Sequence, residues 1–92
     1  MKFVIRSNDT TNEFVGIVTA DTHAAAAARA ARRYYHLGRR GGATRVTGDP
    51  NASGVFRTTT PTENGISCGA AFHVAVLDAA LRRWLIISGV RL

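Results

Sequence analysis

Residues 22–47 constrain the fold of this 92-residue chain more than any other stretch. Alanine dominates the first half of this segment and has the highest intrinsic helix propensity, so the sequence predicts a helix over His23–His36. Asp21 or Thr22 can cap its start, because both side chains accept hydrogen bonds from backbone N–H groups of a first turn. Gly38 is placed to end it in a left-handed conformation. We therefore expect the remaining elements to pack around this helix.

The net positive charge of the chain lies in the same segment. The formal net charge is +6 at pH 7, and residues 22–47 contain six arginines and no aspartate or glutamate. Cationic and acidic residues balance each other in the rest of the chain. Arginine outnumbers lysine eleven to one, and a GC-rich genome would favour Arg, Ala and Gly together. Such codon bias explains the preference for arginine but not its concentration in one segment.

Helical spacing places several of these cations on one face of the predicted helix. The positions that share this face are i, i+3, i+4 and i+7, occupied by Arg29, Arg32, Arg33 and His36. The opposite side is apolar and is expected to pack inward, through Ala24, Ala27, Ala28, Ala31 and Tyr35, widened by Tyr34 and Leu37. Like charges at this spacing disfavour an isolated helix by about 0.2–0.5 kcal/mol per pair. We therefore expect an anion from outside the molecule to bind the cationic stripe.

A glycine-rich basic segment follows the helix and extends the cationic surface. Arg39 and Arg40 lie among Gly38, Gly41 and Gly42, where the backbone can approach a phosphate closely. The segment either forms an anion-binding nest or is a plain connection. It lacks the Lys-Ser/Thr ending and the preceding strand of a P-loop, so nucleotide hydrolysis is not expected. The predicted partner-binding residues are Arg29, Arg32, Arg33, His36, Arg39, Arg40 and Arg45.

Three interpretations of this surface remain open from the sequence. It binds the backbone of a nucleic acid by neutralising phosphates and releasing counterions, it meets an acidic protein surface, or it is a solvated helix face. Tyr34 is the aromatic side chain best placed to stack on a base, whereas Tyr35, Phe56 and Phe72 are expected in the core. Arg82 either extends the basic surface or pairs with Asp78 one helical turn earlier.

The histidines and the cysteine show no spacing typical of a metal site, such as Cys-x-x-Cys or His-x-x-x-His. Catalysis by a histidine pair would require His23, His36 and His73 to converge in one cleft. A lone histidine near a helix end is more often a structural or a surface residue. We therefore expect a protein without enzymatic activity, cofactor or metal.

Four segments alternate or carry β-forming residues and are predicted strands: Lys2–Ser7, Phe14–Thr19, Ala43–Thr47 and Val55–Thr60. Polar, glycine-rich turns join them in pairs, which predicts two hairpins. The C-terminal third is ambiguous, because Phe72, Val74 and Val76 alternate like a strand while Val74, Leu77, Leu81 and Trp84 repeat like a helix.

Length favours a helix in this C-terminal third. The run from about Gly69 to Ser88 is too long for an ordinary strand, and Gly89 is a credible stop. A short strand at Ile66–Ala70 can precede this second helix. The predicted fold is one α+β domain over residues 1–92, with a small antiparallel sheet of about four strands, the alanine-rich helix packed against it, and a second C-terminal helix.

Several features favour a cytoplasmic protein. Cys68 is the single cysteine and cannot form an internal disulfide, which indicates a reducing compartment. Residues 1–7 lack the apolar run and small-residue cleavage site of a secretory signal. The longest apolar stretch, residues 70–87, is interrupted by Asp78, Arg82 and Arg83, which argues against a membrane span.

The layout resembles that of small phage and prophage proteins. It consists of a start at Met1, a two-strand opening, the entry Thr19-Ala20-Asp21-Thr22 into an alanine-rich helix, and further short strands. Among such proteins the chain most resembles the anti-CRISPR inhibitors of type I (I-F-like) surveillance complexes, although its basic charge sets it apart from the acidic, DNA-mimicking members.

This resemblance implies a non-enzymatic protein of the bacterial host cytoplasm that binds the CRISPR ribonucleoprotein. Binding would use the Cas backbone subunits, the crRNA or both, and would prevent target DNA from pairing. The residues themselves favour an alternative that uses the same arginines, namely a small basic DNA- or RNA-binding module or a phage regulator.

Overall fold

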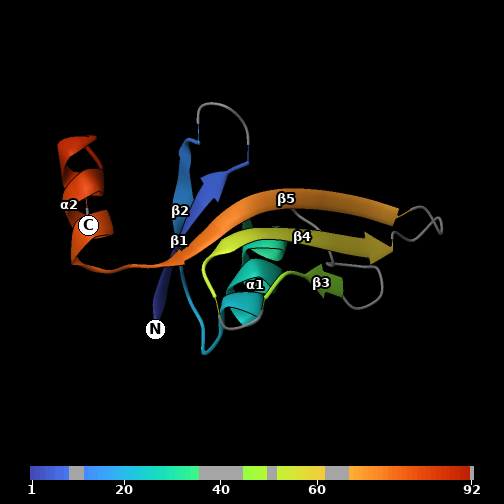
Figure 1. Ribbon diagram of the computed structural model, residues 1–92. Helices are drawn as coiled ribbons and strands as arrows, with labels where there is room; N and C mark the ends of the chain where they lie inside the picture. The colour runs from blue at the N-terminus through green and yellow to red at the C-terminus, as the bar shows by residue number, and fades with distance from the viewer. Residues whose placement is uncertain (9–11, 36–44, 50–51, 62–66, 92) are drawn as a thin grey trace.

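The computed structural model describes residues 1–8, 12–35, 45–49, 52–61 and 67–91. Its strands form one five-stranded antiparallel sheet in the order β2-β1-β5-β4-β3, with two helices (Figure 1). The elements in chain order are β1 (Lys2–Ser7), β2 (Phe14–Thr19), α1 (His23–Tyr35), β3 (Arg45–Thr47), β4 (Gly54–Pro61), β5 (Ser67–Val76) and α2 (Ala79–Ile87). The predicted α+β class is confirmed, with one strand more than expected.

The N-terminal half follows the sequence pattern closely. β1 and β2 have the predicted bounds and pair as an antiparallel hairpin, in which Phe3 lies opposite Val18 and Ile5 opposite Gly16. The register shifts after Ile5, a β-bulge that leaves Val15 as the extra residue of β2. β3 and β4 form the second predicted hairpin. Of the predicted third strand, residues 43 and 44 lie outside the described residues.

The predicted helix from Gly69 to Ser88 is wrong in its first half. β5 extends from Ser67 to Val76 and is the central strand of the sheet, and α2 begins only at Ala79. β5 is longer than an ordinary strand because it pairs with two neighbouring strands at different parts of its length. Residues 67–74 pair with β4 and residues 72–76 pair with β1. A strand paired on both sides gains ladder hydrogen bonds along its whole length, so the two-residue alternation prevails over the helical repeat.

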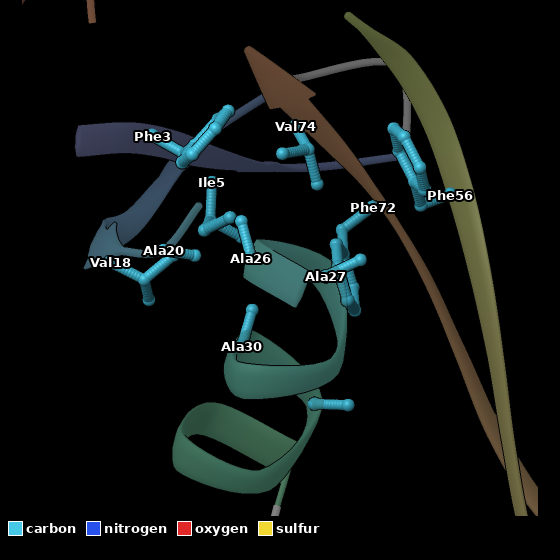
Figure 2. Close-up of a cluster of buried hydrophobic side chains, with 11 residues drawn as sticks. Phe3, Ile5, Val18, Ala20, Ala26, Ala27, Ala30, Phe56, Phe72 and Val74 are labelled. Atoms are coloured by element: carbon cyan, nitrogen blue, oxygen red, sulfur yellow. The ribbon is translucent and has the colours of Figure 1, made fainter. Parts of the chain in front are cut away.

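The main core lies between α1 and one face of the sheet, which we call the inner face. Figure 2 shows alanines of α1 on the side of the helix that faces large side chains of β1, β2, β4 and β5. The fully buried strand residues of this cluster are Phe3, Ile5, Val18, Phe56, Phe72 and Val74. Burial of each contributes roughly 1.5–3 kcal/mol. Because alanine is small, the helix axis can approach the sheet closely.

The inward face of α1 is rotated from the predicted one. Ala26 and Ala30 are fully buried together with Ala27 and Ala31, whereas the expected Ala24 and Ala28 are only half-buried. A run of consecutive alanines contains no apolar contrast, so its sequence does not fix which side packs. The large side chains of the sheet decide the rotation instead.

His23, the first residue of α1, is a core residue. Its ring makes an edge contact with Phe3, with centroids 4.8 Å apart, and stacks on Phe56 at 6.4 Å. Nε2 lies 3.2 Å from Ser53 Oγ, which gives one ring nitrogen a polar partner. The side chain is 8% exposed, so it fixes the start of α1 against β1 and β4.

Side chains and glycine set the helix ends. Thr22 Oγ1 accepts a hydrogen bond from Ala25 N, so Thr22 is the cap of α1. Asp78 caps α2 by accepting from Leu81 N at 2.8 Å. Gly89 follows α2 with φ of +88°, and the N–H groups of Gly89 and Val90 donate to Ile86 O and Leu85 O, which confirms the predicted stop.

α2 packs on the other face of the sheet, which we call the outer face. Figure 1 places α1 and α2 on opposite sides of β1 and β2. Val4, which alternates with the inner-face residues Phe3 and Ile5, is fully buried, as is Leu85 of α2. Within the described ranges, neither helix has the length and apolar character needed to cross a membrane.

Candidate nucleic-acid interface

The described part of the predicted cationic stripe lies on the solvent side of α1. Arg29, Arg32 and Arg33 are all exposed, while Ala26 and Ala30 on the other side of the helix are fully buried. The remaining predicted residues His36, Arg39 and Arg40 lie outside the described residues. We call Arg29, Arg32 and Arg33 the helix arginines.

Arg29 is anchored to the edge of the sheet. Its Nη1 donates a hydrogen bond of 2.6 Å to the backbone carbonyl of Thr19, the last residue of β2. The guanidinium has further N–H donors, so this anchor orients the group without exhausting it. Arg29 therefore presents a positioned cation beside β2.

Arg33 is positioned by its neighbour Tyr34. The Arg33 guanidinium lies 5.5 Å from the centroid of the Tyr34 ring, within the range of a cation–π contact. Tyr34 itself packs against the core, and its hydroxyl donates a long hydrogen bond of 3.4 Å to Ile17 O. The expectation that Tyr34 is the aromatic residue free to stack on a base is wrong, because its ring is half-buried between α1 and β2.

The helix arginines have no acidic partner among the residues that the structure describes. In the described ranges, Arg29, Arg32 and Arg33 form no ion pair with a carboxylate, and α1 has no acidic residue in its first turn. Arg32 and Arg33 lie in the last turn, where the helix dipole favours cations by about 0.3–1 kcal/mol each. This compensation leaves three neighbouring positive charges open to an external anion.

Arg45 does not share this surface. It pairs with Thr59 at the start of β3, and the next residue, Val46, packs against the core from the inner face. Because successive strand residues point to opposite faces, Arg45 lies on the outer face, away from α1. Of the predicted site residues that the structure describes, Arg29, Arg32 and Arg33 thus lie on α1, whereas Arg45 lies on the opposite side of the sheet.

The outer face carries further basic residues that are not among the predicted site residues. Arg57 alternates with the inner-face residues Phe56 and Thr58, and His73 alternates with Phe72 and Val74. Arg57 is exposed and His73 is half-buried. The period-2 pattern of the predicted strands already placed Arg57 on the side opposite Phe56. The position of His73 required knowing that residues 67–76 form a strand.

The two described histidines do not converge. His23 lies between Phe3 and Phe56 on the inner face, whereas His73 lies on the outer face opposite Val55 and Arg6. His36 lies outside the described residues. Across the described ranges, no three His, Cys, Asp or Glu side chains are grouped closely enough to hold a metal ion.

Asp78 does not form the expected ion pair with Arg82 among the described residues. Its carboxylate caps α2 at Leu81 N instead. Arg82 and Arg83 are exposed on α2, next to Trp84, Ile86 and Ile87. The apolar members of this group are exposed by 40%, 59% and 78%.

Comparison of the sequence and fold with known proteins found no matching family model, no matching curated protein and no matching solved structure. What the protein binds is therefore inferred from its own side chains.

Proposed function

We propose that this chain is a small non-enzymatic protein that binds the sugar-phosphate backbone of a nucleic acid through the helix arginines. The observation that supports this most strongly is that Arg29, Arg32 and Arg33 are exposed together and form no ion pair within the described ranges. A guanidinium matches phosphate oxygens with a planar fork of donors. Each phosphate neutralised also releases condensed counterions, which drives binding.

The packing of α1 supports the same function. Its inward side consists of buried alanines and its start is fixed by the His23 ring, so the helix is held rigidly against the sheet. Arg29 is further oriented by Thr19 O and Arg33 by the Tyr34 ring. Positioned side chains lose less conformational entropy on binding than free ones. The helix arginines are therefore partly preorganised for an anionic ligand.

The layout resemblance suggests a particular nucleic acid, the crRNA of a type I CRISPR surveillance complex. In this first candidate function, the protein is an anti-CRISPR inhibitor in the bacterial host cytoplasm. The helix arginines contact the Cas backbone subunits or the crRNA, and the bound protein blocks target DNA. The test is target-DNA binding by a purified type I complex with and without the protein. Inhibition by the parent chain and its loss in Arg32→Glu/Arg33→Glu are expected; unchanged inhibition by the variant contradicts the proposed surface.

The second candidate function is a free DNA- or RNA-binding module. It is favoured by the helix arginines themselves, which require only a phosphate backbone and no particular protein. It predicts binding to purified duplex or single-stranded nucleic acid that weakens steeply as salt rises. Pull-downs from host lysate with and without nuclease treatment separate the two candidates. Nuclease removes a free nucleic acid, whereas a ribonucleoprotein partner remains as its protein subunits.

A further inference from the structure

We propose that the outer face of the sheet is a second phosphate-binding surface, so that one molecule holds two nucleic-acid segments on opposite sides. The residues that define this surface are Arg6, Arg45, Arg57 and His73, which we call the outer-face basic residues. They come from β1, β3, β4 and β5 and lie on the side of the sheet away from α1. This inference goes beyond the proposed function, which holds even if the outer face binds nothing.

The strand register brings the outer-face basic residues into one line. Arg57 lies opposite Thr47 on β3 and Ala71 on β5, which makes Arg45 and His73 its diagonal neighbours on the two sides. His73 lies directly opposite Arg6 on β1. Directly opposed residues have Cβ atoms about 4.5–5.5 Å apart, and diagonal ones about 7–8 Å. Each of these basic residues therefore neighbours the next across four adjacent strands.

The surroundings of this line include small and polar side chains and, directly opposite His73, the exposed apolar side chain of Val55. No outward position of the five strands is acidic among the described residues. Beside the arginines lie Thr47 and Thr59, both exposed, and Gly69 and Ala71 of the central strand. Threonine hydroxyls are further donors to phosphate oxygens. Around Arg45 and Arg57 the surface therefore combines positive charge with hydroxyl donors, and it carries one exposed apolar side chain, Val55.

The length of the line indicates a polymer as the ligand. Outside the part that α2 covers, the line runs from His73 on β5 through Arg57 on β4 to Arg45 on β3, and these three adjacent strands span two inter-strand spacings, which is about 10 Å. A single small anion cannot contact both ends of such a line, whereas a sugar-phosphate backbone presents repeated charges along its length. The like charges of the diagonal neighbours Arg45 and Arg57 repel each other, so a polyanion bound to both also relieves a cost within the fold.

The composition of the outer face favours nucleic acid over an acidic protein. Energetically important centres of protein interfaces are enriched in buried Trp, Tyr and Arg that fill pockets. The part of the outer face made by β3, β4 and the adjoining half of β5 has no outward aromatic side chain among the described residues except the His73 ring. Phosphate contacts, in contrast, need only donors and charge.

α2 limits the surface at one end. Arg6 lies 5.6 Å from the Trp84 ring centroid, and Val4 beside it is fully buried. The α2 helix therefore covers the β1 end of the outer face and leaves Arg45 and Arg57 exposed. These two arginines are the ones to vary, because they are exposed and make no described contact with the core.

A bridging assay tests this inference. One duplex is fixed to beads, the protein is added, and capture of a second, fluorescent duplex is measured. The parent chain is expected to capture the second duplex. Arg45→Glu/Arg57→Glu is expected to bind a single duplex but to lose most of this capture. Arg32→Glu/Arg33→Glu is expected to show the same result, because it retains only the outer-face surface. Arg82→Glu/Arg83→Glu, with the same charge change on α2, is the matched control and is expected to bridge.

The outcomes separate the two proposals. Bridging by Arg45→Glu/Arg57→Glu at the parent level overturns the second surface and leaves the helix arginines as the binding site. The same holds if the parent chain binds single duplexes without bridging. If Arg45→Glu/Arg57→Glu loses all binding while Arg32→Glu/Arg33→Glu binds as well as the parent chain, the result supports the outer face and overturns the proposed function. Absence of duplex binding by the parent chain overturns the second surface as a duplex-bridging site, and absence of binding to single-stranded DNA and RNA as well overturns both proposals.

Two controls accompany these variants. Circular dichroism melting of each variant verifies the fold. Arg45→Gln/Arg57→Gln, which adds no negative charge, is expected to lose an intermediate share of the capture of the second duplex.

Discussion

The Tyr34 ring of α1 lies directly over Gly16 of β2, so that a Cβ atom built at Gly16 would overlap the Tyr34 hydroxyl and ring. Gly16 faces α1 because it pairs with the inner-face residue Ile5. The absence of a side chain at this position allows the ring to reach Ile17 O and to lie beside the Arg33 guanidinium. One glycine on the sheet thus helps to position a helix arginine.

Gly16→Ala is expected to destabilise the fold by about 1–3 kcal/mol, because the added methyl group displaces the Tyr34 ring from its site. Urea unfolding followed by circular dichroism measures the change. The matched control is the same substitution made in a Tyr34→Ala background, where the space is free. There, Gly16→Ala is expected to cost clearly less, and strictly additive effects of the two substitutions would contradict the described contact.

His23→Ala is expected to lower the free energy of unfolding by about 2–4 kcal/mol, since it leaves a cavity between Phe3 and Phe56. Ser53→Ala, which removes only the polar partner of the ring, is expected to cost about 1 kcal/mol. Thermal or urea unfolding of both variants provides the comparison. An unaffected His23→Ala variant would show that the histidine is not part of the core.

Asp78→Ala is expected to fray the start of α2, at a cost of about 1 kcal/mol, because Leu81 N loses its hydrogen-bond acceptor. Asp78→Asn is the matched control, since asparagine is an equally good cap. Amide hydrogen exchange measures the effect locally, with faster exchange expected for α2 and little change for β1 and β5. Equal exchange in both variants would argue against the capping role.

Local patterns predict the parts of this fold whose contacts are local. The bounds of β1 and β2 and the course of α1 follow from alternation, alanine content and caps such as Thr22. β5 was misassigned because its strand character depends on two partners distant in the sequence. The inward side of α1 was misassigned because an alanine run has no apolar contrast.

The candidate site shows the same division. The exposure of Arg29, Arg32 and Arg33 follows from helical periodicity within one element. The separation of Arg45 from them depends on how β3 pairs with β4, and the line formed with Arg57 and His73 depends on the pairing of β4 with β5. These relations join segments far apart in the chain, so spacing along the sequence does not contain them.

The salt dependence of nucleic-acid binding tests the central claim most directly. Fluorescence anisotropy with a short labelled duplex gives the association constant at several salt concentrations, for the parent chain and for Arg32→Glu/Arg33→Glu. The charge-matched control is Arg82→Glu/Arg83→Glu on α2. We expect the parent chain to bind with an affinity that falls linearly on a double-logarithmic plot against salt. We expect the Arg32→Glu/Arg33→Glu variant to bind more weakly, with a slope shallower by about 2, and the control to stay close to the parent. Equal binding by the parent and the Arg32→Glu/Arg33→Glu variant, or no binding by the parent at low salt, would contradict a phosphate-binding role for the helix arginines.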